Sequence, residues 1–393
     1  MDFWKRAQEL NQDTVDNRRY FHAHAEVGLN LPKALQYIDE KLRQYGITPR
    51  RCGHGITATI GSGGRVLLMR ADMDALPMAE QSGLPFACPT GKEAHTCGHD
   101  FHAAMLLTAA RMLKEQEQEL KGTVKLMFQP AEETFEGGKD MIAAGILENP
   151  RVDAALSFHV GPGGTPGGYF YNDRGTMMNS CDGFRIKVEG KGAHGAYPHM
   201  SVDPINIAVH IHTALQELIA RESDPADRAT LTVGRFAAGT AFNIIPDTAV
   251  LEGSIRTNSK KGRTLLTSRM KEIAQQTAQT FHGQARVEML SQVPPLICDP
   301  VFIREILGYM EQIPAPNRMA LPGIESSGSD DFAEVTDRVP GAYLFLAAGF
   351  PDRAPGQSHS PTVVFNEEVL PFGAAAFAHC ASRWLSDHPL QET

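Results

Sequence analysis

Four side chains in the first half of the chain have the types and spacing of metal ligands. Cys97 and His99 stand two residues apart in Glu-Ala-His-Thr-Cys-Gly-His-Asp (93–100), so both side chains can face one point on an extended turn. Glu133 and His159 each follow a run of apolar residues typical of a β-strand. Thiolate, imidazole and carboxylate groups bind zinc and neighbouring divalent metals. The four residues therefore predict one metal site.

Glu132 stands beside Glu133, and neighbouring side chains on an extended segment point in different directions. One of the two carboxylates can therefore bind a metal while the other holds a water molecule. Most Glu-Glu pairs lie in solvated loops, but this pair follows an apolar strand and a Gln-Pro turn, where an α/β sheet places ligand groups. A thiolate of Cys97 beside His99 would instead be a nucleophile for acyl transfer. The additional Glu and His residues favour the metal site over the nucleophile.

Asp72 and Asp74 follow the apolar run 66–69 and lie on the same side of an extended chain. They either cap a turn or accept a hydrogen bond from a ligating histidine, and the sequence leaves both interpretations open. His22 and His24 are spaced like metal ligands but fall at the end of a helix-like segment. We expect these two histidines to be structural, or at most to support the ligands.

The elements that must position these residues alternate between strands and helices. Apolar runs at 66–69, 124–128 and 154–158 predict strands, and the pattern at 102–113 predicts a helix. Residues 32–45 place apolar side chains on one face of a further helix. This alternation is typical of an α/β domain with a central mixed sheet flanked by helices.

The pattern changes at about residue 182. The following elements have the order β-α-β-β-α-β, which usually folds as a ferredoxin-like unit of roughly 100 residues. They are strand 184–189, helix 203–221, strands 230–236 and 248–257, helix 261–280 and strand 284–290. The α/β pattern then resumes with helix 300–312, strand 342–348 and helix 367–385. We therefore expect a discontinuous catalytic domain, 1–182 and 295–393, interrupted by an inserted α+β domain, 183–294.

Composition narrows the class of protein. A chain of 393 residues exceeds the usual size of one core, and 42% hydrophobic residues describe an ordinary globular protein. A formal charge of -9 argues against nucleic acid and anionic membranes as partners and favours a small molecule. The N-terminal residues lack the apolar core of a secretory signal, and the 6 cysteines are scattered. We expect a cytoplasmic protein.

Five strings of the sequence occur, in this order, in one enzyme family. They are Arg-Ala-Asp-Met-Asp-Ala-Leu-Pro (70–77), His-Thr-Cys-Gly-His-Asp (95–100), Phe-Gln-Pro-Ala-Glu-Glu (128–133), Gly-Lys-Gly-Ala-His-Gly-Ala-Tyr-Pro-His (190–199) and Phe-Asn-Ile-Ile-Pro (242–246). With them the chain resembles the N-acyl-L-amino acid amidohydrolases, in the branch of the aminoacylase and carboxypeptidase G superfamily that includes hippurate hydrolase and auxin-conjugate hydrolases. The resemblance spans nearly the whole chain and implies a two-metal peptidase domain interrupted by a lid domain that forms dimers.

The resemblance also implies roles for single residues. Glu132 would be the general base, and Asp74 the aspartate that steadies the site. The superfamily's usual histidine two residues before that aspartate is Asp72 here, and this branch uses a cysteine among its ligands instead. The ligand types admit zinc, manganese, cobalt or nickel. Two divalent ions per subunit would be bound by Cys97, His99, Glu133, His159 and His359.

Three residues of the inserted domain match residues that reach the substrate in related enzymes: His194, Asn243 and Arg256. In those enzymes the histidine arrives from the partner subunit. The planar guanidinium of Arg256 suits an amino acid carboxylate, which it can bind through two hydrogen bonds. Asn243 could instead set the turn before Pro246, and Arg256 could be a solvated strand residue.

The predicted activity is metal-dependent hydrolysis of the amide bond of N-acyl-L-amino acids, or related acyl or aryl conjugates. The predicted assembly is a homodimer, with a tetramer left open. Glu132, Asp74 and His194 would be the catalytic residues. A dipeptidase or carboxypeptidase of the same superfamily is the alternative. A non-catalytic protein that binds acyl amino acids is a more distant alternative, because every expected ligand and the base are present.

Overall fold

The computed structural model describes residues 1–389 and contains two compact units. The first unit consists of Met1–Met177, Ile297–Glu325 and the chain from Asp330 onward. The second consists of Met178–Leu296 and the short segment Ser326–Ser329. The division expected from the sequence has its boundaries at 182 and 294 and leaves that short segment in the catalytic domain.

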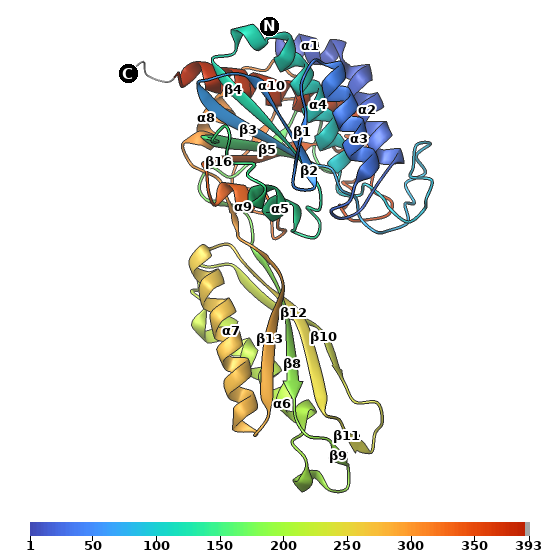
Figure 1. Cartoon of the computed structure of the whole chain (residues 1–393), viewed down its shortest axis with the longest axis vertical. Coiled ribbons are helices and arrows are strands. Elements are labelled where there is room, and N and C mark those ends of the chain that lie inside the picture. Colours follow the sequence, from blue (N-terminus) through green and yellow to red (C-terminus); the bar gives the residue numbers. More distant parts are fainter. Residues whose placement is uncertain (390–393) are drawn as a thin grey trace. The chain divides into compact units, whose positions relative to one another are not determined.

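An eight-stranded mixed sheet forms the centre of the first unit (Figure 1), in the order β1-β2-β4-β3-β5-β16-β6-β15. Its strands are β1 (Arg50–Cys52), β2 (Gly55–Gly61), β3 (Arg65–Asp72), β4 (Gly122–Gln129), β5 (Ala154–Gly161), β6 (Tyr169–Phe170), β15 (Ala320–Leu321) and β16 (Gly341–Ala347). Strand β3 is parallel to both β4 and β5, and β5 is parallel to β16. These strands are almost fully buried, as expected for parallel strands covered on both faces.

Helices pack on both sides of this sheet. They are α1 (Phe3–Glu9), α2 (Asn11–Ala23), α3 (Pro32–Gln44), α4 (His99–Glu115), α5 (Gly137–Ala143), α8 (Phe302–Met310), α9 (Ala333–Thr336) and α10 (Leu370–Asp387), with 3-10 turns η1 (Glu117–Glu119) and η4 (Glu367–Val369). The mostly apolar α4 packs against β3, β4 and β5 and also against α2 and α10. Since nearly all of its residues are buried, α4 is held firmly against the sheet.

The second unit is built on a four-stranded antiparallel sheet in the order β10-β12-β8-β13. Its strands are β8 (Cys181–Glu189), β10 (Ala229–Ala238), β12 (Thr248–Thr257) and β13 (Gln284–Val293). Helices α6 (Pro204–Glu217) and α7 (Lys260–Thr280) pack on each other and on this sheet (Figure 1). Element order and strand order are those of a ferredoxin-like unit, so the predicted fold is confirmed.

Shorter elements complete the chain. A two-stranded ribbon pairs β9 (Ala193–His194) with β11 (Ile244–Ile245). A second pair joins β7 (Thr176–Met178) to β14 (Leu296–Ile297), and the remaining turns are η2 (Pro198–Met200) and the π-helical η3 (Leu218–Glu222). Within residues 1–389, no helix combines the length and apolar character that a membrane span requires.

The fold of the first unit brings the predicted ligands to one edge of its sheet. Asp72 is the last residue of β3, Gln129 is the last residue of β4, and His159 lies near the end of β5. Because these three neighbouring strands are parallel, their carboxyl ends meet at the same edge. The residues that directly follow β3, β4 and β5 in the sequence therefore lie close together.

Candidate metal centre

Cys97 lies just before α4 and His99 begins this helix, whereas the sequence predicted an extended turn for both. His99 is the first residue of the helix, and Gly98 before it adopts a left-handed conformation with φ 91°. A Cβ atom at residue 98 would overlap Val160 Cγ2. Only glycine accommodates both this conformation and this close approach, so Gly98 lets the cysteine and histidine come to the end of β5.

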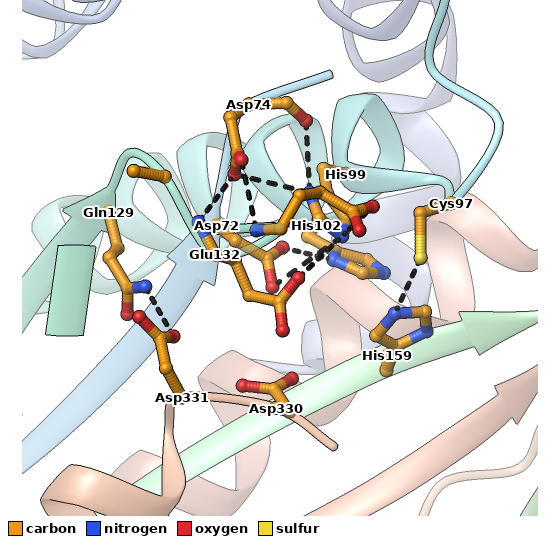
Figure 2. Close-up of polar contacts among 12 residues, drawn as sticks. Asp72, Asp74, Cys97, His99, His102, Gln129, Glu132, His159, Asp330 and Asp331 are labelled. Carbon is orange, nitrogen blue, oxygen red and sulfur yellow. Dashed lines mark hydrogen bonds and ion pairs between the residues drawn. The ribbon is translucent and has the colours of Figure 1, made fainter. Parts of the chain in front are cut away.

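The two buried histidines each direct Nε2 toward other donor side chains of the site (Figure 2). His99 Nδ1 donates to the backbone oxygen of Asp74 over 2.9 Å, and His159 Nδ1 donates to that of Val160 over 2.8 Å. His159 Nε2 lies 3.4 Å from Cys97 Sγ. His99 Nε2 is buried and has no hydrogen-bond partner in the part of the chain that the structure describes. Both Nε2 atoms are therefore placed as a metal ligand requires.

Glu133 and His359 bring the remaining donor atoms. His359 Nε2 lies 3.4 Å from Glu133 Oε1, and this buried oxygen makes no hydrogen bond to any described residue. His359 adopts φ 63°, which is uncommon for a residue other than glycine. Its backbone N–H donates to Thr96 O over 3.0 Å, so the strained turn is tied to the segment that carries Cys97.

The donor atoms form overlapping groups whose members lie within 4.8 Å of one another. The groups are Cys97, His99 and His159; Cys97, Glu133 and His359; and His99, Glu132 and Glu133. Buried polar atoms almost always have a hydrogen-bond partner, yet His99 Nε2 and Glu133 Oε1 make no hydrogen bond to a described residue. A bound cation would satisfy both atoms. The sulfur, nitrogen and oxygen donors present here fit divalent metal ions.

Asp74 holds the turn that carries the two glutamates. Its carboxylate accepts the backbone N–H of Glu132 over 3.0 Å and that of Glu133 over 3.1 Å. Ala131 and Phe135, which flank the pair, both have positive φ. Because such backbone strain persists only where the surroundings enforce it, Asp74 fixes the direction of both glutamate side chains. This contact agrees with the steadying role that the resemblance implies.

Glu132 is 5% exposed and lies among other carboxylates. Oxygen atoms of Glu132, Asp330 and Asp331 lie within 4.8 Å of one another. Burial, together with the charges of Asp330 and Glu133, raises the pKa of Glu132 well above its ordinary value. This shift favours the protonated form of the carboxyl group, and such a shift is found in residues that both accept and donate protons.

The chemistry of Cys97 argues against the nucleophile interpretation. Burial raises the pKa of the Cys97 thiol to about 12. An activated cysteine nucleophile needs the opposite shift, because the thiolate is the reactive form. A metal ion would favour the thiolate by coordination.

Comparison with known proteins decides the family. A model described as Peptidase family M20/M25/M40 matches residues 68–383. The chain belongs to this family. The IAA-amino acid hydrolase ILR1-like 4 of Arabidopsis thaliana is 35% identical over 382 residues, which are 94% of this chain and 85% of the relative. The N-acetyl-L-cysteine deacetylase of Bacillus subtilis (strain 168) is 36% identical over 347 residues, 86% of this chain and 80% of the relative.

A solved structure of the family is also similar. The Bacillus subtilis YXEP protein, described as a dinuclear metal binding peptidase from the M20 family, has a TM-score of 0.82. It is 29% identical, and the match covers 96% of this chain and 99% of that protein. The M20 family thus includes a dinuclear metal-binding protein with this fold.

The sequence did not single out several residues that lie beside the site. Arg70 is 1% exposed and forms ion pairs with Asp72 over 2.5 Å, Asp330 over 3.1 Å and Asp331 over 3.0 Å. Gln129 Nε2 donates to Asp331 Oδ1 over 2.6 Å (Figure 2). The adjacent aspartates in Ser-Gly-Ser-Asp-Asp (327–331) were the available signal. They could have been found as a polar cluster after a small-residue turn.

The residues expected to reach the substrate from the second unit lie in two places. Exposed His194 and Asn243 belong to the β9–β11 ribbon, where Gly195 N donates to Asn243 O over 2.8 Å. The ribbon strand β11 directly precedes β12 in the chain, whereas Arg256 lies near the C-terminal end of β12. The Nη1 atom of Arg256 donates to Ser329 Oγ over 3.0 Å. A strand advances about 3.3 Å per residue, so β12 separates Arg256 widely from the ribbon within one subunit.

Proposed function

We propose that this M20-family chain is a metal-dependent amidohydrolase that cleaves the amide bond of N-acyl amino acids or related conjugates. The products are a carboxylic acid and a free amino acid. The observation that carries the proposal is the convergence of the donor atoms of five side chains, in overlapping groups, beside a buried glutamate, Glu132. The relatives named as an amino acid conjugate hydrolase and a deacetylase support the same chemistry.

The ligands proposed for two divalent ions are Cys97, His99, Glu133, His159 and His359. Bound ions would lower the pKa of a water molecule toward about 7 and polarise the substrate carbonyl. Their identity among zinc, manganese, cobalt and nickel stays a proposal. Sulfur and nitrogen donors favour zinc, whereas the carboxylate also suits manganese.

Glu132 is proposed to move the proton. In the first step its carboxylate takes a proton from the attacking water, and in the second it gives that proton to the leaving amine. Its surroundings suit both steps, because burial and the nearby Asp330 favour the protonated form that must exist between them. Asp74 keeps the carboxylate in place through the backbone of the same turn.

We also propose a homodimer in which His194 of the partner subunit stabilises the developing oxyanion. Asn243 would contact the same substrate, and Arg256 would bind its carboxylate. Exposed apolar side chains of the second unit support a protein interface: Tyr197, Met200, Val209, Phe236, Phe242 and Ile244. Pairing of dimers into tetramers and a cytoplasmic location stay predictions.

The test is hydrolysis of a panel of N-acyl amino acids and free dipeptides by purified protein. The protein is assayed as isolated, after removal of metal by a chelator, and after addition of manganese, zinc, cobalt or nickel. We expect release of amino acid from acylated substrates that stops on chelation and returns with one metal. Faster cleavage of unblocked dipeptides would favour the dipeptidase or carboxypeptidase alternative. Stoichiometric binding without turnover would favour the binding protein.

A further inference from the structure

His102 has no role in the proposed reaction, although it lies beside the metal centre. It follows His99 by three residues on α4 and is 1% exposed. Its ring centroid lies 4.5 Å from that of His159 (Figure 2). Donor atoms of Asp72, His99 and His102 lie within 4.8 Å of one another, so a direct role in metal binding has to be considered first.

Both ring nitrogens of His102 are already used. Nδ1 lies 2.5 Å from Asp72 Oδ1, and Nε2 accepts the backbone N–H of Val160 over 2.9 Å. A carboxylate only accepts hydrogen bonds, so Nδ1 carries the proton and Nε2 has the lone pair. This lone pair is occupied by Val160. His102 is therefore a neutral imidazole with no nitrogen left for an ion.

We propose that His102 is a positioning residue that fixes the orientation and tautomer of His159 through Val160. This inference rests on the proposed metal site, in which His159 is a ligand. The hydrogen bond from Val160 to His102 holds the backbone immediately after His159. The carbonyl of Val160 accepts the Nδ1 proton of His159, which leaves Nε2 unprotonated and facing Cys97.

The end of β5 is paired with a described strand on one side only. Its pairing with β16 continues to Gly161, whereas its pairing with β3 ends at Arg70 and Ser157. His102 supplies an acceptor in the stretch that lies beyond this pairing. Partners that orient ligating histidines usually change metal affinity by about 10-fold to 100-fold when they are removed.

Asp72 extends the arrangement to the buried Arg70. One oxygen of Asp72 accepts from Arg70 over 2.5 Å, while the other accepts from His102. Asp72 thereby keeps the Nδ1 proton on His102, which is the condition for Nε2 to accept from Val160. The aspartate that stands at the superfamily's usual histidine position thus contacts the positioning residue in this chain.

The experiment uses the full chain with and without metal. The tautomer of His159 is read from nitrogen-15 NMR of histidine-labelled, metal-free protein, with the resonance assigned by a His159→Gln variant. Metal affinity and the number of bound ions are measured by calorimetry with zinc and by mass spectrometry. The variants are His102→Leu, which cannot accept from Val160, and His102→Gln, whose side-chain oxygen can. Thr108→Val removes a buried hydrogen bond elsewhere on α4 and is the matched control.

We expect His159 to carry its proton on Nδ1 in the wild type and in the Thr108→Val control. His102→Leu should give a mixture of tautomers and bind metal at least about 10-fold more weakly. His102→Gln should recover part of both properties. Loss of one ion per subunit from His102→Leu, with His159 unchanged, would overturn the proposal and make His102 a ligand. An unchanged tautomer and affinity would also overturn it. If the wild type binds no metal, the proposed function fails, while the tautomer measurement still tests the contact.

Discussion

Glu132 and Glu133 are neighbours in the sequence but differ in their contacts. Glu132 lies among carboxylates, whereas Glu133 lies beside His359. Although burial opposes it, the nearby imidazoles of His359 and His99 lower the pKa of Glu133. We therefore predict that Glu132→Gln keeps both metal ions but loses roughly two to four orders of magnitude in kcat, the scale of a lost general base.

Glu133→Gln is the matched variant for this prediction. It changes one carboxylate to an amide in the same turn and should lower metal content, because it removes an anionic ligand. Steady-state kinetics and metal analysis of the two purified variants separate the roles. Wild-type turnover in Glu132→Gln, or loss of its metal, would contradict the assignment of the base.

The thiol of Cys97 leads to a prediction about how metal affinity depends on pH. Since burial raises the pKa of its thiol to about 12, the proton is present at neutral pH and must leave when a metal binds. Metal affinity should therefore increase with pH between about 6 and 8 in the wild type, with proton release detected by calorimetry in buffers of different ionisation enthalpy. Cys97→Ala should bind metal more weakly and release fewer protons, whereas Cys52→Ala should behave like the wild type. Full metal occupancy without activity in Cys97→Ala would instead support a cysteine nucleophile.

The sequence predicted those site residues that have a recognisable local signal, either a close spacing or a preceding strand. Cys97 and His99 form a visible pair, and Glu133 and His159 follow recognisable strands. Arg70 and Asp331 were not predicted, because they are 261 residues apart and meet only in the folded chain. His102 was missed although it follows His99 by three residues. That helical spacing alone does not distinguish a core histidine from one that holds the backbone of a neighbouring strand.

At the scale of elements, Gly98 controls how α4 meets β5. A Gly98→Ala variant would place a methyl group against Val160 in a left-handed conformation. We expect the free energy of unfolding to fall by roughly 2–4 kcal/mol from strain and overpacking, with loss of metal affinity. Gly91→Ala is the control, because Gly91 has φ 63° and an added methyl group there would meet no described atom within 4 Å. The Gly91→Ala change should lower the free energy of unfolding by about 1 kcal/mol. Urea denaturation of both variants measures the two losses.

Helices α2 and α4 are joined by a buried ion pair. Arg18 Nε lies 2.7 Å from Asp100 Oδ2, and His22 Nδ1 lies 2.8 Å from the same oxygen. His22 is thus structural, as expected from the sequence. Asp100→Ala leaves a buried guanidinium without its main partner, so we predict a loss of about 3–5 kcal/mol of stability. Asp13→Ala removes the exposed pair with Arg111 and should cost less than about 1 kcal/mol. Urea denaturation of metal-free protein compares them.

The contribution of this ion pair to the stability of the protein should also depend on pH, and the direction of the change can be derived. Burial alone would raise the pKa of Asp100, but Arg18 and His22 bring it below its usual 3.8. A carboxyl group whose pKa is lower in the folded state stabilises the protein above its unfolded pKa. The contribution of Asp100 should therefore be present at neutral pH and disappear as the pH falls below about 4. The stability difference between wild type and Asp100→Ala should shrink over that range.

Long elements were predictable and short ones were not. The helix expected at 32–45 is α3, and the strand expected at 248–257 is β12. Their periodic patterns extend over enough residues to be distinguished from a chance arrangement of apolar residues. By contrast, the two-residue strands exist only through pairing with distant segments, so no local pattern marks them: β6, β9, β11, β14 and β15.

At the scale of the whole molecule, the proposed dimer can be tested at the open edge of the second unit. Strand β10 has ten residues, lies at the edge of its sheet and is largely exposed. Such an edge presents unpaired backbone groups that can bind another strand. Phe236 on this strand is 43% exposed and Val209 on α6 is 48% exposed. We predict that a Phe236→Asp, Val209→Asp variant is monomeric by light scattering and inactive, yet binds metal normally. Retained activity in a proven monomer would contradict the dimeric site.

Mixed dimers give the sharpest test of where His194 acts. A His194→Ala chain keeps Glu132, and a Glu132→Gln chain keeps His194, so each homodimer should be inactive. If the histidine acts on the partner's site, a mixed dimer has one complete site, formed by Glu132 of one chain and His194 of the other. Equal co-expression should then restore about a quarter of wild-type activity, because half of the dimers are mixed and each has one working site. If His194 acted within its own chain, no mixed dimer would contain a complete site and activity would stay at the level of the separate variants. Two differently tagged chains, purified through both tags, would isolate the mixed dimer and should show half the wild-type rate.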